Sequence, residues 1–415
     1  MQSNLQKLLE AREQRDAREQ NILKTYHGCT LITIRANYAG ENKNTLYSHL
    51  ISYTLFLEVQ KKIKPVKIFH ELTFEGLIFF VVTKDAAREV KAKTVSIEEE
   101  FFLGRLADLD VRTAEKMISR SDFRLPPRRC LLCNNRAVFC VRNRTHPIAA
   151  VLKKTIAITE QFFTRAPNMQ TLFSRIARAS MLEELCRTVS LGCVNVNSNG
   201  SHHDMDFLLM LKGIDVIADS MRNLRQKNIK NFAALRAYGA EYEKKLFAAC
   251  GGVNTYKGVY FLLLILSAAA LQTKNYSQLQ AYSAKFSLPC LQDLPPAEQA
   301  KPLSVLGIRG EAVSGFSNHF NIFLPLLENG ADYETITLKI LQHTYDTTTI
   351  KRGGIAALHT IQRHAQNVRR AADLEHLNTY CLEHNLSTGG VADNFIITYA
   401  LYLLKKYGGF FFRDR

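Results

Sequence analysis

The hydrophobic pattern of this 415-residue chain changes once, and the change separates two kinds of fold. Up to about residue 170, β-branched runs alternate with segments of helical spacing. From residue 172 onward, long apolar segments with spacings of three and four replace them, and strand signals disappear. A proline in residues 164–170 separates two helical patterns. The sequence therefore predicts a multidomain chain, with a small α/β (α+β) domain over residues 1–170 and an all-α domain over residues 171–415.

The first domain is expected to be a small sheet with helices packed against it. Apolar residues at helical spacing predict helices over residues 5–23 and 44–64. Strands are predicted over residues 29–36, 66–69, 77–83, 94–99 and 106–111. Helices of the second domain are predicted over residues 207–223, 232–249, 259–271, 320–328 and 395–406, and the proline-containing residues 287–302 are expected to form a loop.

The chain has 54 Lys and Arg residues against 38 Asp and Glu residues, a formal net charge of +16 at pH 7. This balance predicts a polyanionic partner, which can be a nucleic acid, a nucleotide or an acidic protein. Nine cysteines and a polar start without a hydrophobic signal core favour a reducing, cytoplasmic location. The most apolar run, residues 259–271, is shorter than the roughly 20 residues that cross a bilayer, so no membrane span is expected.

Residues 104–146 concentrate groups that bind metals and phosphates, beginning with an Asp108-Leu-Asp110 pair and including nine arginines. Side chains alternate along a strand, so both aspartates would project from one face and could share a divalent cation. A solvated pair is the alternative. Bidentate forks to phosphate oxygens can come from Arg105, Arg120, Arg124, Arg128 and Arg129. This combination suits metal-assisted phosphoryl transfer.

Four possible zinc ligands have the spacing Cys130-x2-Cys133-x6-Cys140-x5-His146. Three thiolates and one imidazole can form a tetrahedral site that holds a loop-rich segment together. Only one Cys-x-x-Cys pair is present, and free thiols beside an arginine-rich turn are the alternative. Zinc is therefore possible here, and the spacing alone does not decide.

Glycines beside charged residues occur four times in the second half, at residues 251–258, 307–311, 346–354 and 387–393. The first segment precedes an apolar helix, so its free backbone amides and Lys257 can hold phosphates. Each segment alone is most often a helix stop or cap. Four of them in one helical domain suggest helix ends that converge on a polyphosphate.

A polar segment, residues 199–206, precedes the predicted helix over residues 207–223. Asp204 and Asp206 in this segment can either complement the dipole of that helix or bind a cation. The sequence leaves the two alternatives equally open.

Three blocks of the first half are specific enough to indicate a family. They are Leu-Gly-Arg-Leu-Ala-Asp-Leu-Asp-Val at residues 103–111, Ile-Ser-Arg-Ser-Asp-Phe-Arg-Leu-Pro-Pro-Arg-Arg-Cys-Leu-Leu-Cys at residues 118–133 and Cys-Val-Arg-Asn-Arg-Thr-His at residues 140–146. Together they resemble the CitX family of apo-citrate lyase phosphoribosyl-dephospho-CoA transferases. The Arg-Glu-Gln-Arg segment at residues 12–15 also fits the N-terminal helix of that family.

Five blocks of the second half carry another resemblance, at residues 199–206, 251–258, 308–312, 346–354 and 385–393. In order and spacing they are similar to the CitG family of triphosphoribosyl-dephospho-CoA synthases. The chain departs from that family's sequence at residues 192–197, at Tyr256, where the family has histidine, and at residues 387–393. The two halves together resemble the bifunctional CitXG arrangement.

The resemblance implies two reactions. The second domain would join ATP to 3′-dephospho-CoA, with the 2′-hydroxyl of the CoA ribose displacing adenine from C1 of the ATP ribose. The first domain would let a serine of the citrate lyase acyl carrier protein attack the α-phosphate of the triphosphoribosyl group and release diphosphate. Mg²⁺ is the expected cofactor, and the expected partners are the carrier protein, ATP and 3′-dephospho-CoA.

The resemblance also implies roles for individual residues. In the first domain, Asp108 and Asp110 would hold Mg²⁺ and act in catalysis, while Arg105, Arg128 and Arg129 would neutralise the diphosphate. In the second domain, Asp204 and Asp206 would bind metal, and Glu311 and Asp346 would act in catalysis. The residues expected to bind substrates there are Asn254, Lys257, Gly258, Arg309, Arg352, Gly353, Gly354 and Asp393.

Two other functions fit part of the same sequence. A basic, zinc-stapled module that binds RNA explains the charge, but it does not explain four glycine-and-charge segments in the helical half. The equivalent enzyme of a malonate decarboxylase system would use the same prosthetic-group chemistry. The blocks of the first half favour the citrate lyase system, and nucleic acid is not the expected partner.

Overall fold

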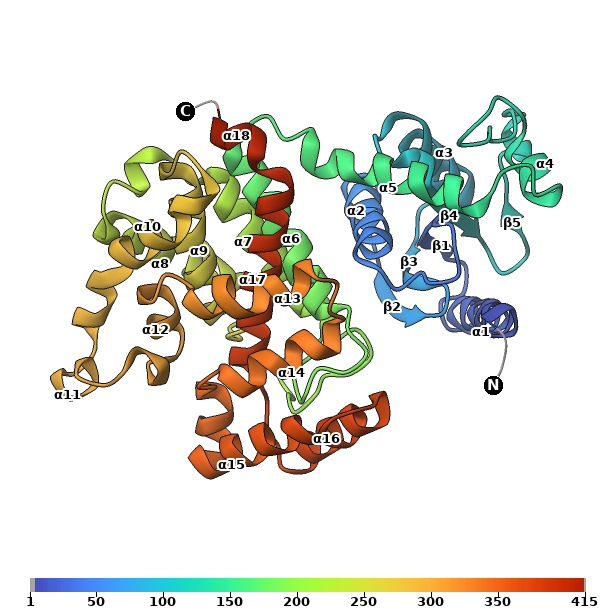
Figure 1. The fold of residues 1–415 in the computed structure, drawn as a ribbon. Coiled ribbons are helices and arrows are strands. Elements are labelled where there is room, and N and C mark those ends of the chain that lie inside the picture. The colour runs from blue at the N-terminus through green and yellow to red at the C-terminus, as the bar shows by residue number, and fades with distance from the viewer. Residues whose placement is uncertain (1–3, 414–415) are drawn as a thin grey trace. The chain divides into compact units, whose positions relative to one another are not determined.

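The computed structural model describes residues 4–413, and the chain forms two compact units, Met1–Phe162 and Phe163–Arg415 (Figure 1). The strands that the structure describes all lie in the first unit, and the described part of the second unit contains only helices and connections. A small sheet near the N-terminus followed by a mostly helical region is what the hydrophobic pattern predicts. Among residues 4–413, no helix combines the length and the apolar character that crossing a membrane requires.

The first unit contains a five-stranded sheet in the order β2-β3-β1-β4-β5, in which all neighbours are antiparallel. The strands are β1 (Thr30–Ala36), β2 (Lys67–Thr73), β3 (Gly76–Thr83), β4 (Ala107–Arg112) and β5 (Met117–Ile118). Four of the five predicted strands are confirmed, although their ends differ by one to a few residues. Their β-branched and aromatic side chains form the buried layers on which the sheet depends.

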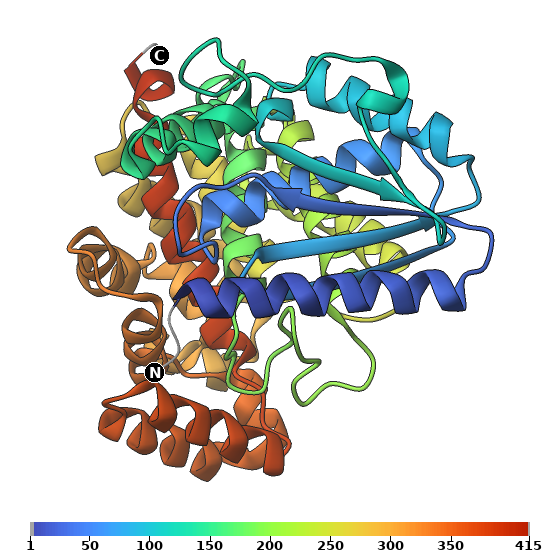
Figure 2. The ribbon, with the colours of Figure 1, turned by 90° about the vertical axis from the view of Figure 1, so that its right-hand side faces the viewer.

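Helices cover both faces of the sheet. They are α1 (Asn4–Thr25) on one face and α2 (Leu46–Lys62) with α3 (Ala87–Glu100) on the other. Ile22 and Leu23 of α1 pack in one cluster with Phe80 of β3, whereas Phe56 of α2 stacks on Phe79 with ring centroids 4.2 Å apart. Successive residues of a strand point to opposite faces, so α1 and α2 lie on opposite sides of β3. Figure 2 shows α1 running alongside the strands.

The strand predicted over residues 94–99 is wrong, because these residues form the end of helix α3. Within six residues, the alternation of Val95 and Ile97 with polar neighbours imitates a strand. Over the whole of α3, buried Val90, Thr94 and Ile97 are spaced by four and three residues, which is helical spacing. The helical spacing is therefore visible over the whole of α3 but not within residues 94–99 alone.

The rest of the first unit has little regular structure. After β5 come the short 3₁₀ turn η2 (Ser121–Phe123), helix α4 (Ala137–Arg142) and helix α5 (Ile148–Thr164). The side chain of Asn168 accepts a hydrogen bond from the backbone N–H of Thr171 and so caps the next helix, α6.

The second unit is built from helices, most of them joined by short connections, with a longer non-helical connection over residues 186–206. The helices are α6 (Met169–Leu185), α7 (Phe207–Asn223), α8 (Phe232–Ala249), α9 (Lys257–Gln272), α10 (Leu279–Ser287), α11 (Pro296–Gln299), α12 (Gly307–Val313), α13 (Leu324–Glu328), α14 (Tyr333–His343), α15 (Thr347–Asn367), α16 (Ala371–Glu383), α17 (Gly389–Tyr407) and α18 (Gly409–Arg413). The five helices predicted here are confirmed. The expected loop over residues 287–302 contains the 3₁₀ helix η5 (Leu288–Asp293) and α11, because proline in a first helical turn lacks only an N–H that has no partner there.

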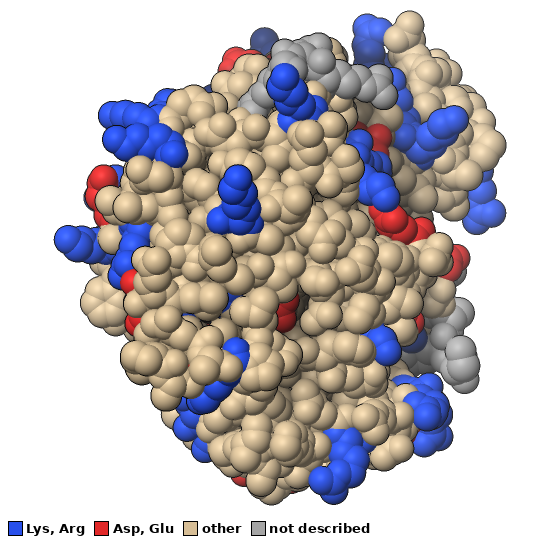
Figure 3. All heavy atoms as spheres, turned by 60° about the vertical axis from the view of Figure 1, so that its left-hand side comes forward, with Lys and Arg blue, Asp and Glu red and all other residues tan. Residues whose placement is uncertain are grey.

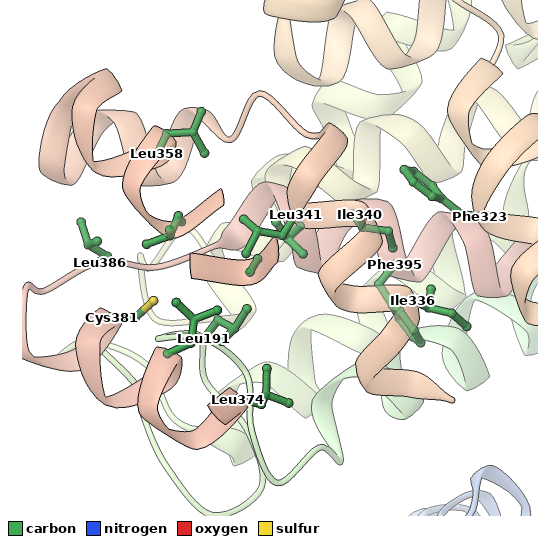
Figure 4. Close-up of a cluster of buried hydrophobic side chains, with 14 residues drawn as sticks. Leu191, Phe323, Ile336, Ile340, Leu341, Leu358, Leu374, Cys381, Leu386 and Phe395 are labelled. Carbon is green, nitrogen blue, oxygen red and sulfur yellow. The ribbon is translucent and has the colours of Figure 1, made fainter. Parts of the chain in front are cut away.

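A buried cluster joins α14, α15 and α16 to α17 (Figure 4). Ile336 and Ile340 of α14, Leu358 of α15 and Leu374 of α16 meet Phe395 of α17 in this cluster. Each of these side chains is at most 5% exposed. The cluster packs the part of α15 that follows a kink at Gly354 (φ +76°) against α17, and the starts of both helices belong to the site described below.

Two candidate active sites

The first unit has a small cavity of about 310 Å³ on the sheet face that α1 covers. Its lining residues are Arg12, Arg15, Arg35, Ala36, Asn37, Lys43, Glu75 and Asp108. Four cationic side chains therefore surround two carboxylates. An arrangement with this excess of positive charge attracts a small polyanion such as a diphosphate.

Arg35 links the two predicted aspartates. Its Nη2 lies 2.8 Å from Asp108 Oδ2 and 3.0 Å from Asp110 Oδ2, and β1 pairs with β4 so that Arg35 stands opposite Asp108. The two aspartates alternate along β4 with buried Ala107, Leu109 and Val111, which confirms that they share one face. The guanidinium of Arg35 therefore pairs with the carboxylates of both Asp108 and Asp110.

The carboxylate of Glu75 contacts three of the arginines that line the cavity. Glu75 lies in the turn between β2 and β3 with its side chain only 1% exposed. Its carboxylate accepts hydrogen bonds from Arg15 Nη1 at 2.7 Å and from Arg35 Nη1 at 2.8 Å, and Arg12 Nε lies 3.6 Å away. A buried carboxylate with these partners orients three guanidinium groups toward one region.

Asp108 lines the cavity and Asp110 lies beside it, outside the lining. The pKa values of Asp110 and of Lys43, which lines the cavity, are displaced from their ordinary values. Burial, and then the neighbouring charge of Asp108, raises the pKa of Asp110, and the cation Arg35 opposes part of this rise. Burial also lowers the pKa of Lys43, although the nearby charge of Glu75 opposes the change. The aspartate pair can therefore take up a proton more readily than an isolated aspartate.

The structure does not bring Arg105, Arg128 and Arg129 into this cavity. Arg105 Nη2 donates to the carbonyl oxygens of Arg129 and Cys130, at 2.9 and 3.0 Å. Arg128 Nη1 donates to the carbonyl oxygen of Ala107 at 2.7 Å, and its Nη2 pairs with Glu98 at 3.3 Å. These contacts tie residues 128–130 to the start of β4 and leave the expected phosphate role without geometric support.

Sequence reasoning missed the arginines that do line the cavity. Arg12 and Arg15 are three residues apart on α1 and so share a helix face. Arg35 is two residues from Thr33 on β1, so these two side chains point to the same face of the sheet. Both spacings are visible in the sequence. The pairing of β1 with β4 brings Arg35 to the aspartates, and this pairing could not be predicted from the sequence.

The second unit has a larger cavity, of about 870 Å³, at the starts of α9, α12, α15 and α17. Residues at these four starts line it, among them Gly258, Ile308, Thr348 and Gly390. The four glycine-and-charge segments are thus brought to one place. Of the residues expected to bind substrates, Asn254, Lys257, Gly258, Arg309 and Asp393 line the cavity, whereas Arg352, Gly353 and Gly354 do not.

Asp393 belongs to α17, and its carboxylate lies against the start of α9. The sequence predicts that a phosphate binds at this helix start. The carboxylate of Asp393 accepts a hydrogen bond from the backbone N–H of Val259. A side chain at Gly258 would collide with this carboxylate, so glycine there permits the close approach. Burial, followed by the charges of Asp346 and Glu184, holds the pKa of Asp393 well above its ordinary value.

Asp346 joins the starts of α15 and α17 and is fully buried. Its Oδ1 accepts the N–H groups of Thr348 and Thr349, both at 2.9 Å, and its Oδ2 accepts that of Val391 at 3.0 Å. Burial raises the pKa of Asp346, and these backbone donors partly offset the rise. Because backbone groups engage both oxygens, the geometry gives Asp346 a positioning role.

Arg352 and His202 form a second positioning contact. Arg352 Nη2 donates to His202 Nδ1 at 3.2 Å, and Arg352 Nη1 donates to the carbonyl oxygens of Ser201 and Asn385. His202 lines the cavity, and its Nε2 lies 2.9 Å from Ser387 Oγ. Since Nδ1 accepts, Nε2 carries the proton and donates to Ser387. Burial and the charge of Arg352 lower the pKa of His202, which favours this neutral form.

The remaining predicted residues lie outside the cavity lining. Asp206 Oδ1 accepts the N–H of Leu209 at 2.8 Å, so the capping alternative is confirmed for Asp206. Asp204 is 62% exposed. Glu311 of α12 faces His319, with 3.7 Å between Oε2 and Nδ1, and burial raises its pKa to about 7.

Glu184 is the carboxylate that sequence reasoning missed. It lies on α6, is only 4% exposed and lines the large cavity. Burial raises the pKa of Glu184 to about 7, although the charge of Arg187 works against this rise. Its sequence context, a continuous helix with two adjacent glutamates, carries no signal that separates Glu184 from Glu183.

The cysteine and histidine side chains of the first unit do come together. The ligand atoms of Cys130, Cys133, Cys140 and His146 all lie within 4.8 Å of one another. Among the described residues, this is the one group of three or more Cys, His, Asp or Glu side chains arranged to hold a metal ion.

Both units match known protein families in sequence. Residues 3–162 match the family model of CitX, apo-citrate lyase phosphoribosyl-dephospho-CoA transferase. Residues 171–289 and 300–411 match that of CitG, ATP:dephospho-CoA triphosphoribosyl transferase. The two matches fall on the two units, each of which has its own cavity.

Relatives with both domains cover nearly the whole chain. Protein CitXG of Leuconostoc mesenteroides subsp. cremoris is 27% identical over 95% of this chain and 96% of its own length. Protein CitXG of Haemophilus influenzae is 28% identical over 95% of both chains. The 2-(5''-triphosphoribosyl)-3'-dephosphocoenzyme-A synthase of Pectobacterium atrosepticum is 29% identical over 55% of this chain and 87% of its own length.

These matches define a transferase of citrate lyase prosthetic-group biosynthesis. The chain belongs to the CitG family and carries a CitX domain ahead of it, which makes it a bifunctional protein of the CitXG type.

Proposed function

We propose that the two units catalyse successive steps. The second unit joins ATP to 3′-dephospho-CoA and releases adenine. The first unit transfers the phosphoribosyl-dephospho-CoA group to a serine of the citrate lyase acyl carrier protein and releases diphosphate. The observation that carries this proposal is the presence in each unit of a cavity whose lining includes charged side chains, with different chemistry in each.

The large cavity fits the adenine-releasing step. Its volume of about 870 Å³ lies near the upper end of the roughly 300–1,000 Å³ of small-molecule sites. Asp346 and Asp393 already accept from N–H groups at the starts of α9, α15 and α17, so cationic side chains are the stronger candidates for binding the triphosphate. Those that line the cavity are Arg236, Lys257, Arg309 and Lys351.

In this step the 2′-hydroxyl oxygen of the dephospho-CoA ribose forms a bond to C1 of the ATP ribose, and the bond from C1 to adenine breaks. We assign Glu184 to accept the hydroxyl proton, because a carboxylate with a pKa of about 7 is an effective base near neutral pH. The departing adenine takes up one proton, so the step releases none overall. Asp393 lies on the same cavity wall and can stabilise positive charge at C1 when it is ionised. Asp204 and Asp206 lie outside the lining, so a Mg²⁺ ion held by them does not fit this site.

The small cavity fits the transfer step. The serine hydroxyl oxygen of the carrier attacks the α-phosphorus, and the bond to the diphosphate breaks. Asp108 and Asp110 take up the hydroxyl proton, since the pKa of Asp110 is raised. Arg12, Arg15 and Lys43 neutralise the diphosphate as it leaves.

Asp108 and Asp110 are the residues that would hold a Mg²⁺ ion, because both carboxylates are partly exposed on one strand face and Arg35 engages only one oxygen of each. A bound Mg²⁺ would supply further charge neutralisation at the phosphates.

The charge of the chain suits an acidic carrier protein. Acyl carrier proteins are generally acidic, and the chain has a net charge of +16. On the face drawn in Figure 3, Lys and Arg side chains are scattered among uncharged residues and form no continuous track of the kind that a nucleic-acid backbone follows.

The proposal is tested by incubating the purified chain with ATP, 3′-dephospho-CoA, Mg²⁺ and apo carrier protein. We expect diphosphate and modified carrier to form in equal amounts, and adenine in at least that amount. Without carrier, adenine should still be released and diphosphate should not. A chain that releases no adenine, or that leaves the carrier mass unchanged, would contradict the proposed pair of reactions.

A further inference from the structure

The cluster of Cys130, Cys133, Cys140 and His146 has the dimensions of a metal site. Cys133 Sγ lies 3.5 Å from Cys140 Sγ and 3.3 Å from His146 Nε2. In a tetrahedral zinc site with Zn–S distances of about 2.3 Å and Zn–N distances of about 2.0 Å, ligand atoms are about 3.5–3.8 Å apart. The side chains therefore stand close to the separation that a single ion would impose.

Local backbone structure presents these side chains from three places. Cys130 and Cys133 flank a turn closed by hydrogen bonds from Cys130 N–H to the carbonyl oxygen of Asn135 and from Ala137 N–H to that of Arg128. Cys140 lies on α4, which begins directly after this turn. A reversal through Arg144, at φ +46°, then brings His146 back, with Thr145 N–H donating to the carbonyl oxygen of Cys140.

Hydrophobic packing contributes little to the stability of residues 119–147. Of residues 119–147, only Cys140 is buried. The apolar side chains of α4 point outward, with Val138, Phe139 and Val141 between 54% and 76% exposed. A loop-rich segment without a core needs another source of stability, and a structural metal is a common one.

We propose that Cys130, Cys133, Cys140 and His146 bind one Zn²⁺ ion in a closed, structural site. Three thiolates and one imidazole are typical of zinc among the common metals. The N–H of Leu132 donates to Cys130 Sγ at 3.4 Å, which is the support that a metal-bound thiolate receives from its surroundings. Four protein ligands leave no open position, so the ion takes no part in the proposed transfer.

The site lies next to the strand that carries the aspartates. Arg105 Nη2 donates to the carbonyl oxygen of Cys130, and Arg128 Nη1 donates to that of Ala107, the first residue of β4. Loss of the ion frees residues 128–130 and loosens the start of β4. The zinc site therefore supports the transfer step and leaves the second unit unaffected.

The first experiment measures the metal content of the full chain, purified reduced and without chelators. We expect about one zinc per chain in the wild type and in Cys29→Ser, whose cysteine is in the first unit but outside the cluster. Cys133→Ser should retain less than about a fifth of that zinc, since its sulfur contacts two of the other ligands. Little zinc in the wild type, or equal zinc in both variants, would overturn the proposal.

A second experiment does not depend on any variant. The reduced wild-type chain is stripped of metal at low pH and titrated with Co²⁺ at neutral pH. Tetrahedral thiolate ligation predicts intense visible absorption and a thiolate-to-cobalt band in the near ultraviolet, both saturating at one equivalent and both bleached by Zn²⁺. Weak octahedral absorption, or the absence of a thiolate-to-cobalt band, would overturn the site.

Discussion

Arg35 Nη2 lies 2.8 Å from Asp108 Oδ2, across the pairing of β1 with β4. The same guanidinium donates from Nη1 to buried Glu75, so it is held at both ends. This contact places a permanent cation against the carboxylate that we assign to the transfer step. It also explains why a functional arginine lies more than seventy residues from the aspartates in the sequence.

Replacing Arg35 separates the two activities. Arg35→Ala removes a fixed cation from the diphosphate region, so we expect carrier modification to fall by about 10²–10³-fold. Adenine release, measured in the same samples, should stay at the wild-type rate, because the second unit carries out that step. Arg18→Ala, on the same helix as Arg15 but facing Phe69, is the matched control. An Arg35→Ala chain that modifies the carrier normally would exclude Arg35 from the site.

The pKa of Glu184 predicts a pH dependence for adenine release. Burial raises the pKa to about 7, and only the ionised form can act as a base, so the rate should rise up to about pH 7 and level off above it. Glu184→Gln should lower the rate by about 10²–10⁴-fold and remove this rise. The exposed Glu241→Gln is the control. An unchanged profile in Glu184→Gln would assign the base elsewhere.

The same carboxyl predicts a change in stability with pH. Its pKa is higher in the folded chain than the ordinary 4.5, so the folded state favours the protonated form. The stability that this form contributes is complete below about pH 4.5 and is lost as the pH rises to about 7. Glu184→Gln should therefore lose less stability than the wild type between these two values, as measured by urea unfolding. An identical loss in both chains would contradict the raised pKa.

Gly258→Ala tests the close approach of Asp393 to the start of α9. The added Cβ would meet the carboxylate and displace it, because this approach leaves no room for a side chain. We expect adenine release to fall by at least tenfold and the unfolding free energy to fall by about 1–3 kcal/mol. Gly409→Ala is the control, since a Cβ at Gly409 meets nothing within 4 Å. Wild-type adenine release from Gly258→Ala would show that the contact is not needed.

Helices could be predicted where the helical spacing of apolar residues continued over several turns. The helices over residues 207–223 and 232–249 have the predicted bounds, because several turns of helical spacing lie between clear polar breaks. The error over residues 94–99 arose in a window of six residues, in which helix and strand patterns look alike. Over residues 94–99 only the spacing of buried residues along the whole of α3 shows the helix.

The candidate sites could be predicted only where neighbours in sequence are also neighbours in space. Asp108 and Asp110 share a strand, so their common face followed from alternation alone. Arg35 and Glu184 reach their sites through strand pairing and helix packing, which no local pattern records. Asp346 was found by its motif, but its role as a shared cap of two helices depends on Val391, forty-five residues away.

The division of the two steps between the units is tested most directly by following adenine and carrier mass in two variants. Asp108→Asn should release adenine from ATP and leave the carrier unmodified. Lys257→Ala should fail to release adenine, yet modify the carrier when the preformed triphosphoribosyl-dephospho-CoA is supplied. Loss of both activities in either variant, or carrier modification by Asp108→Asn, would contradict the assignment of one step to each unit.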